Sequence, residues 1–351
     1  MNNKSLFLVA VTGLLLSLLT HADIQRAADG KPDLTGTYDT ATVTPVQRPP
    51  ALGNTLTLSE ERGRQIAAQV AAVKAAGVRS SDPKRDAPPV GGDGSTGPSG
   101  NVGGYNLFWV DFGDTAIKIN GEYRTSIIID PPNGRYPAMT PVAQMKMSKL
   151  FGQVLHKNEG DAWWLKEKGP GPYDGPENLT LSDRCLLGFG STGGPPMLPT
   201  LYNNMKRIVQ TPDHVMILVE MVHDARIVRL NSEHVDPSVR KWLGDSIGWW
   251  EGDTLVVDTT NFTNQPSLYG ASGDLHVVER FKRTDKDSLL YSFTVDDPKS
   301  WLAPWSGEYP WPATKTSVYE YACHEGNYAM GNILRGARLL EGEAIAGDAR
   351  N

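Results

Sequence analysis

Alternation of apolar and polar residues with a period of two dominates the second half of the chain. Successive side chains of a strand point to opposite faces, so each such run predicts a half-buried β-strand. The predicted strands are 207–210, 214–222, 225–230, 254–261, 275–283, 288–295 and 317–323. Short polar turns join them, and sequential antiparallel strands close into a barrel or stack as a sandwich. We therefore predict a mainly β fold, a curved antiparallel sheet or a lipocalin-like β-barrel, with one or two peripheral helices.

Two helices are predicted before this region. Alanine and charged residues fill 61–76, where Thr57 and Glu60 form a capping box and Gly77 ends the helix. A second helix is predicted around 142–155. Short strands are predicted at 34–38, 106–112, 115–119 and 123–129, with Asn120-Gly121 as a hairpin turn between the last two.

Glycine and proline concentrate in two segments that lack apolar periodicity. Residues 80–104 predict a mobile surface loop or a lid over a pocket. Residues 169–200 predict an ordered irregular loop. Because no repeat of fixed period appears, a propeller is disfavoured. We predict a single β-rich domain over residues 23–351.

The N-terminus has the pattern of a cleaved secretory signal. Lys4 precedes an apolar run at 6–19, and Thr20-His21-Ala22 places small residues at the −3 and −1 positions. The run is too short to span ~30 Å of hydrocarbon as a helix. We therefore predict a signal peptide over residues 1–22, a periplasmic or secreted mature protein, and no membrane insertion.

Composition limits which binding partners and covalent links the sequence predicts. The net charge of −6 is spread along the chain without a basic stripe, which argues against nucleic acid. The only two cysteines, Cys185 and Cys323, predict one disulfide in an oxidising compartment. It would contribute on the order of 4–5 kcal/mol by restricting the unfolded chain. A metal site using Cys323 and His324 is a weaker alternative, because neighbours in a strand point to opposite faces.

Two long motifs are distinctive: WEGDTLVVDTTNF at 250–262 and YEYACHEGNY at 319–328. Shorter ones are PPMLP at 195–199 and EMVHD at 220–224. Together they resemble a family of exported, mostly uncharacterised proteins from environmental bacteria. The resemblance covers most of the chain after residue 30. It implies export and a single domain, and it implies no particular activity.

Charged residues end the strand at 214–222, whose two apolar faces predict burial on both sides. In a structural interpretation Glu220 pairs with Arg226, and Asp224 caps the turn through its backbone. In a functional interpretation His223 is a general base or acid oriented by Asp224 or Glu220, because imidazole titrates near neutral pH.

Glu279 lies on the apolar face of 275–283, where desolvation raises the pKa of a carboxyl group unless a cation pairs with it. It is either buried in an ion pair with Arg226 or Arg229, or a proton-donating acid inside a pocket.

His324 and Glu325 form a further candidate acid–base pair. The disulfide would hold them beside Asp183 and Arg184, and a loop fixed rigidly beside such a pair is a reasonable place for a site. The alternative is a stabilised strand end. Paired aromatic and polar residues provide candidate ligand contacts at Tyr202, Asn204, Arg226, Trp250 and Tyr321.

Familiar catalytic signatures are missing from the sequence. It has no Gly-x-Ser-x-Gly elbow, no phosphate-binding glycine loop, no His-Glu-x-x-His helix and no dinucleotide fingerprint. No cofactor is therefore predicted. His223, His276 and His324 could meet as a metal site, but scattered histidines alone are weak evidence, so a metal site is only a minority alternative.

The leading hypothesis is an exported enzyme that performs acid–base chemistry on a small neutral ligand in a β-lined pocket. Hydrolysis, elimination or isomerisation would fit, with His223, Asp224, Glu220, Glu279, His324 and Glu325 as the candidate catalytic residues. The alternative is a periplasmic small-molecule binding or carrier protein without catalysis. A third option is a scaffold component that meets partners through its Gly/Pro-rich loops. The sequence leaves the oligomeric state open.

Overall fold

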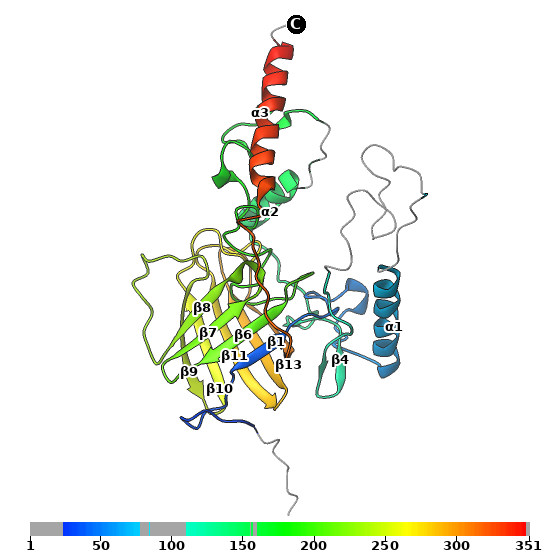
Figure 1. Ribbon diagram of the computed structural model, residues 1–351, viewed down its shortest axis with the longest axis vertical. Coiled ribbons are helices and arrows are strands. Elements are labelled where there is room, and N and C mark those ends of the chain that lie inside the picture. The colour runs from blue at the N-terminus through cyan, green and yellow to red at the C-terminus, as the bar shows by residue number, and fades with distance from the viewer. Residues whose placement is uncertain (1–23, 78–83, 85–109, 155, 157–159, 349–351) are drawn as a thin grey trace, which may run out of the picture.

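The computed structural model describes residues 24–77, 84, 110–154, 156 and 160–348 (Figure 1). The predicted signal peptide and, apart from residue 84, the predicted loop at 80–104 lie outside the described residues.

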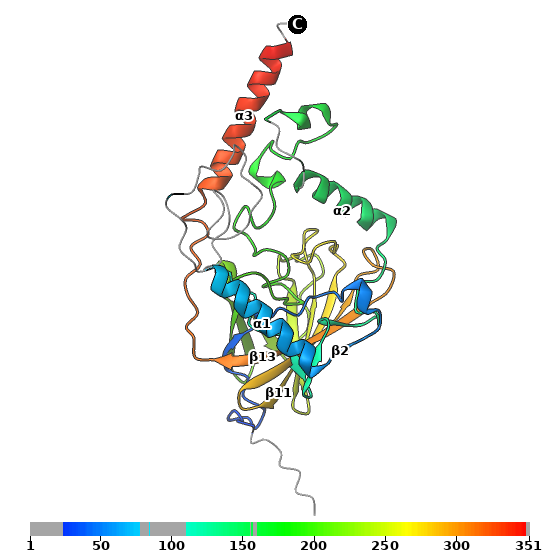
Figure 2. The same ribbon diagram turned by 90° about the vertical axis from the view of Figure 1, so that its right-hand side faces the viewer.

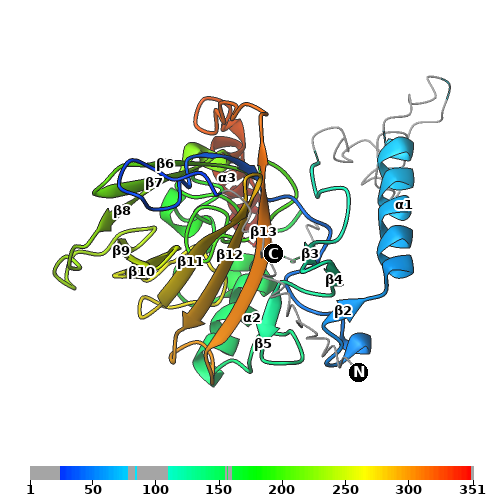
Figure 3. The same ribbon diagram turned by 90° about the horizontal axis from the view of Figure 1, so that it is seen from below.

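A closed β-barrel of nine strands forms the body of the described structure (Figures 1 and 3). Going round the barrel, the strands are β1 (Gly36–Asp39), β6 (Met205–Gln210), β7 (His214–Val219), β8 (Ala225–Leu230), β9 (Asp245–Glu251), β10 (Thr254–Thr260), β11 (His276–Asp285), β12 (Ser288–Asp296) and β13 (Trp305–Thr314). β1 closes the ring because it pairs with β6 on one side and with β13 on the other. Neighbouring strands are antiparallel except β8 and β9, which are parallel. The prediction of a mainly β, barrel-type fold is confirmed.

Further short strands lie outside the ring of nine. β5 (Ile128–Asp130) pairs with β13, and a small sheet contains β2 (Thr57–Leu58), β4 (Glu122–Arg124) and β3 (Lys118–Ile119). The predicted hairpin turn between β3 and β4 is confirmed. Asn120 has φ 53° and Gly121 has φ 83°, the left-handed pair that a tight hairpin needs. Residues 110–112, the described part of the strand predicted at 106–112, are not in a strand.

Three helices accompany the barrel within the described residues: α1 (Glu60–Gly77), α2 (Pro141–Val154) and α3 (Tyr328–Asp348). α1 and α2 were predicted. The capping box was not correct, because Thr57 belongs to β2 and the hydroxyl of Ser59 accepts the Arg62 amide at 3.2 Å. None of the helices that the structure describes is apolar over enough of its length to span a bilayer.

α3, near the C-terminus, was not predicted. The strand predicted at 317–323 is wrong, since those residues form an irregular linker that leads into α3. Figure 1 shows α3 projecting away from the barrel, above α2. Single-turn 3₁₀ segments occur at Pro50–Leu52, Trp163–Lys166, Pro176–Asn178 and Met221–His223. The segment at 169–200 is irregular, as predicted, apart from one of these turns.

β9 and β13 were not predicted, for different reasons. In β9 the inward positions Ser246 and Gly248 are polar or small, so the apolar period is lost. In β13, Pro310 and Pro312 pair with β12 but lie between the residues that pair with β5 and those that pair with β1. Their missing N–H groups therefore cost no bond on that side, which is where proline is tolerated in a sheet.

Aromatic side chains fill the barrel interior. The ring of Tyr291 lies 4.7 Å from that of Trp311 and 5.1 Å from that of Phe281, and all three are fully buried. On β7, Val215, Ile217 and Val219 face inward, whereas the alternate residues are half-buried or exposed. The prediction that both faces of this strand are buried is therefore wrong, and the barrel interior is a packed core rather than an open ligand chamber.

An ion pair crosses this core between β8 and β11. Arg226 meets both carboxylate oxygens of Glu279, and its Nη2–Oε1 distance is 2.9 Å. The Tyr291 hydroxyl donates to Oε1 of Glu279 at 2.7 Å. Both members of the pair are nearly inaccessible to solvent. The buried-ion-pair interpretation of Glu279 is confirmed, and the alternative pairing of Arg226 with Glu220 is wrong.

Removal of one partner should expose the cost of this buried charge. We predict that Glu279→Ala lowers the free energy of unfolding by about 3–5 kcal/mol, because Arg226 is left buried and unpaired. The double variant Arg226→Met/Glu279→Leu should lose much less. Urea unfolding of both variants measures this. A Glu279→Ala protein within about 1 kcal/mol of the parent would contradict a desolvated pair.

Candidate functional site

The turn between β7 and β8 has an unusual backbone. Val222 has φ 57° and His223 has φ 46°, both in the left-handed region. For a β-branched residue such as Val222 this is a genuine outlier, and strain of this kind costs on the order of 1–3 kcal/mol and clusters at functional sites. Val222 is buried while His223 is exposed. The turn therefore points His223 outward and places Asp224 directly after it, immediately before β8.

A pocket of about 450 Å³ opens beside this turn. It brings together three of the candidate catalytic or ligand-binding residues from the sequence: His223, Asp224 and Arg226. The rest of the lining comes from the disulfide-bearing loop, the start of β8 and the segment before and within β9: Cys185, Leu186, Leu187, Val222, Ala225, Ile227, Lys241, Trp242, Leu243, Gly244 and Ser246. The wall is thus mostly apolar, with a few charged groups, as expected for a small-molecule pocket.

Asp224 is a charged group of this pocket whose hydrogen-bonding capacity is only partly used. Its Oδ2 atom is buried and has no hydrogen-bond partner among the described residues. Burial raises the pKa of Asp224 to about 6, although the Gly188 backbone and the charges of His223 and Lys206 pull it down. Gly193 packs so closely that a Cβ atom there would lie 2.7 Å from Oδ2. The glycine-rich loop thus closes over a carboxyl that titrates near neutral pH.

Lys206 lies behind Asp224, inside the barrel. Its side chain is completely buried, and Nζ has no hydrogen-bond partner in the part of the chain that the structure describes. Burial lowers the pKa of Lys206 to about 7, and the charges of Asp224, Glu220 and Asp39 offset this only in part. Lys206 was not among the predicted site residues, because the predicted strand began at residue 207. Its position two residues before Ile208, on the same inward face of β6, was the available signal.

Glu220 and Asn204 hold segments together. The Oε1 atom of Glu220 accepts from the side chain of Asn203 at 2.7 Å, and Oε2 accepts the backbone amide of Tyr319 at 3.0 Å. Asn204 is buried, and its side-chain amide donates to the carbonyl oxygens of Asp111 and Thr200. Both carboxylate oxygens of Glu220 are therefore used to tie the turn to neighbouring loops, and no described contact joins them to the His223 ring.

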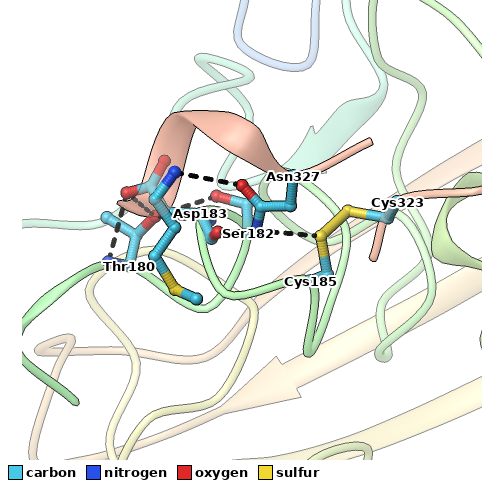
Figure 4. Close-up of a disulfide and its surroundings, with 7 residues drawn as sticks. Thr180, Ser182, Asp183, Cys185, Cys323 and Asn327 are labelled. Atoms are coloured by element: carbon cyan, nitrogen blue, oxygen red, sulfur yellow. Dashed lines mark hydrogen bonds between the residues drawn. A yellow bond between two sulfur atoms is a disulfide. The ribbon is translucent and has the colours of Figure 1, made fainter. Parts of the chain in front are cut away.

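The predicted disulfide between Cys185 and Cys323 is confirmed, with 5.7 Å between the Cα atoms (Figure 4). Beside it, Nδ2 of Asn327 donates to the backbone carbonyl of Asp183 at 2.7 Å (Figure 4). These contacts anchor the linker before α3 to the loop that lines the pocket. His324 and Glu325 lie on the same linker, where both are exposed, and neither lines the pocket of Asp224.

The remaining candidate ligand contacts lie elsewhere. Tyr202, Trp250 and Tyr321 are half-buried and pack against the main core. Tyr321 lines a separate open hollow beside the disulfide. Trp250 has the amine of Lys31 6.0 Å from its ring centre. The structure therefore does not gather these three side chains around His223 and Asp224.

A second charged network lies on the outer wall of the barrel. The two carboxylate oxygens of Asp258 meet Nε2 of His234 at 2.9 Å and Nε2 of His276 at 2.7 Å. Nδ1 of His234 in turn contacts buried Asp245 at 3.1 Å. The hydrogen bond that the Asp258 carboxylate accepts from His276 raises the pKa of His276. Across the described ranges, no group of histidine, cysteine and acidic residues has the arrangement of a metal site.

Comparison with known proteins adds no assignment to this geometry. No protein-family model, curated protein or solved structure matches the chain.

Replacement of Lys206 tests whether its amine is uncompensated. We predict that Lys206→Met raises the free energy of unfolding by up to about 4 kcal/mol at pH 7, because the buried amine is charged more easily in the unfolded chain. The folded pKa of about 7 lies below the ordinary value of 10.5, so the gain should be full below pH 7, decrease as the pH rises from 7 to 10.5, and vanish above 10.5.

Urea unfolding at pH 6, 7 and 10 measures this dependence. Lys282→Met, on the exposed outer face of β11, is the matched control and should change little at any pH. A Lys206→Met protein no more stable than the parent at pH 7 would contradict this prediction. It would show that neighbouring groups compensate the charge of the buried amine.

Proposed function

We propose that the protein is an exported enzyme that performs acid–base chemistry on a small neutral ligand in the pocket at the β7–β8 turn. The observation that carries the proposal is the carboxyl of Asp224, a residue that lines the pocket and has one buried oxygen without a partner among the described residues. A buried polar oxygen without a partner is costly, and such groups are kept where a ligand or a reaction uses them.

Asp224 is the proton-accepting group in this proposal. With a pKa of about 6 it is largely ionised at neutral pH, yet it is a stronger base than an exposed carboxylate. His223 lines the same pocket and is exposed, so in this proposal its imidazole carries a proton between the pocket and the surrounding water. Lys206 lies behind the carboxylate, where its charge helps keep Asp224 ionised.

The pocket walls favour an uncharged ligand. Arg226 faces the pocket but its charge is already balanced by Glu279, and Lys241 donates to Asp245 at 2.7 Å. Leu186, Ile227 and Trp242 supply apolar surface. Hydrolysis, elimination and isomerisation each begin with proton removal from a ligand or a water, and one carboxylate can do this in such a setting. The predicted signal peptide, together with a disulfide, supports export.

Ligand binding without turnover is the second candidate. The observation in its favour is that Glu220 and Glu279 are both fully used in structural contacts, so a second acid near Asp224 is not evident among the described residues. In that case Asp224 would accept a hydrogen bond from a bound ligand and transfer no proton.

A metabolite screen with thermal shift as the readout identifies the ligand, and turnover is then followed directly. We predict that Asp224→Asn keeps the fold and the ligand-induced shift but lowers turnover by at least 100-fold, the usual scale for loss of a general base. The parent rate should rise with pH around a midpoint near 6, because the base must be ionised.

Two further variants sharpen this test. Asp213→Asn, at the exposed hairpin on the opposite end of β7, is the matched control and should leave turnover unchanged. His223→Asn is preferred to His223→Ala, because asparagine tolerates the left-handed φ of 46°. Full turnover in Asp224→Asn would overturn the catalytic role of this carboxyl, and ligand binding with no turnover by the parent would favour the carrier alternative.

A further inference from the structure

α2 stands apart from the barrel and leaves a groove of about 410 Å³ beneath it. Figure 2 shows α2 lying over the loops at one end of the barrel. Among the described residues of this helix only Ala143 is buried. A helix that buries so little is unusual unless its apolar face receives something else, because packing of that face provides most helical stability in proteins.

Apolar side chains line the groove from both sides. Met147 and Leu150 follow Ala143 at intervals of four and three residues, which places them on one helical face, and both line the groove. The opposite wall comes from the loops around residues 177–190 and 265–271. Its apolar members are Leu179, Leu181, Leu187, Pro266, Leu268 and Ala271. The groove volume lies within the range of small-molecule sites, about 300–1,000 Å³.

Two lysines on α2 give the groove a cationic rim. Lys146 donates to the backbone carbonyl of Ala271 at 3.1 Å and keeps its charge uncompensated by any carboxylate in the described structure. Lys149 makes no hydrogen bond or ion pair with the described residues. Glu177 is the single acidic residue of the described lining. An apolar trough with a net positive rim is complementary to a molecule that has a long apolar body and one negative end.

We propose that this groove binds a long-chain carboxylic acid, with the alkyl chain among the leucines and the carboxylate at Lys146 and Lys149. Each methylene that enters the groove should strengthen binding about fourfold, the Boltzmann equivalent of the usual transfer free energy. Affinity should therefore climb with chain length until the groove is full. The inference does not rest on the proposed function, although Leu187 lines both the groove and the Asp224 pocket.

Displacement of the fluorescent fatty acid cis-parinarate by palmitate, measured on the full-length mature protein, tests the proposal. Met147→Asp, on the groove face, should weaken palmitate binding at least tenfold. Met145→Asp makes the same change two residues away, on the opposite face of α2, where the side chain is 74% exposed. It should leave binding unchanged.

The head group is tested separately. Lys149→Glu should weaken palmitate but not hexadecanol, which has the same chain without the charge. Asp224→Asn should bind palmitate like the parent, so that failure of the groove and failure of the catalytic proposal are distinguished.

Three results would overturn the proposal. They are no displacement by any chain length, equal loss in Met145→Asp and Met147→Asp, or a concentration-dependent dimer in sedimentation that Met147→Asp dissociates. The last result would assign the groove face to a second copy of the chain.

Discussion

Compensation of charge inside a closed barrel is the constraint on which the rest of this structure depends. Closure fixes which residues face inward, and an inward ionisable side chain loses water whatever its identity. Glu279 and Arg226 form an ion pair across the core, and the Tyr291 hydroxyl donates a further hydrogen bond to the Glu279 carboxylate. Arg283 donates to the Asp33 carbonyl and to the hydroxyl of Tyr38. Lys206 also points into the barrel, but its amine has no hydrogen-bond partner among the described residues.

The candidate site lies where this compensation is incomplete. Asp224 follows a strained turn, under a loop whose glycines allow close approach, and the disulfide of Cys185 ties that loop to the linker before α3. The strained backbone at Val222 costs free energy, although its side chain packs in the main core, and so does the Asp224 oxygen that has no partner among the described residues. Costs of this kind persist when the surrounding structure over-determines the geometry, and functional sites are where they collect.

The sequence predicted the parts of the fold in which apolar period and inward position coincide. β7, β8, β10, β11 and β12 were found on that basis, and the two cysteines were paired correctly. β9 and β13 were missed because Ser246, Gly248 and the prolines break the apolar period. These residues fit into strands only because of the strands that lie beside them in the sheet. Periodicity reports the local chain, whereas partners across a sheet are set by the fold.

The candidate site was also predictable only in part, because the sequence reports residues that are close along the chain and does not report partners set by the fold. His223, Asp224 and Arg226 share a pocket because they are close in sequence around one turn. Arg226 pairs with Glu279 rather than with Glu220. This choice depends on which strands lie opposite each other in the barrel. The role of Lys206 could be read only after its strand was extended by two residues and the barrel was closed around it.

A carbon-13 NMR titration of the Asp224 side-chain carboxyl tests the central claim most directly. Aspartate labelled at Cγ, with Asp224→Asn used to assign the resonance, reports the ionisation of this one group in the folded protein. Burial without compensation predicts a midpoint near pH 6. A midpoint near the ordinary aspartate value of about 4 would show that water or another group satisfies the buried oxygen, and the account would fail at its foundation.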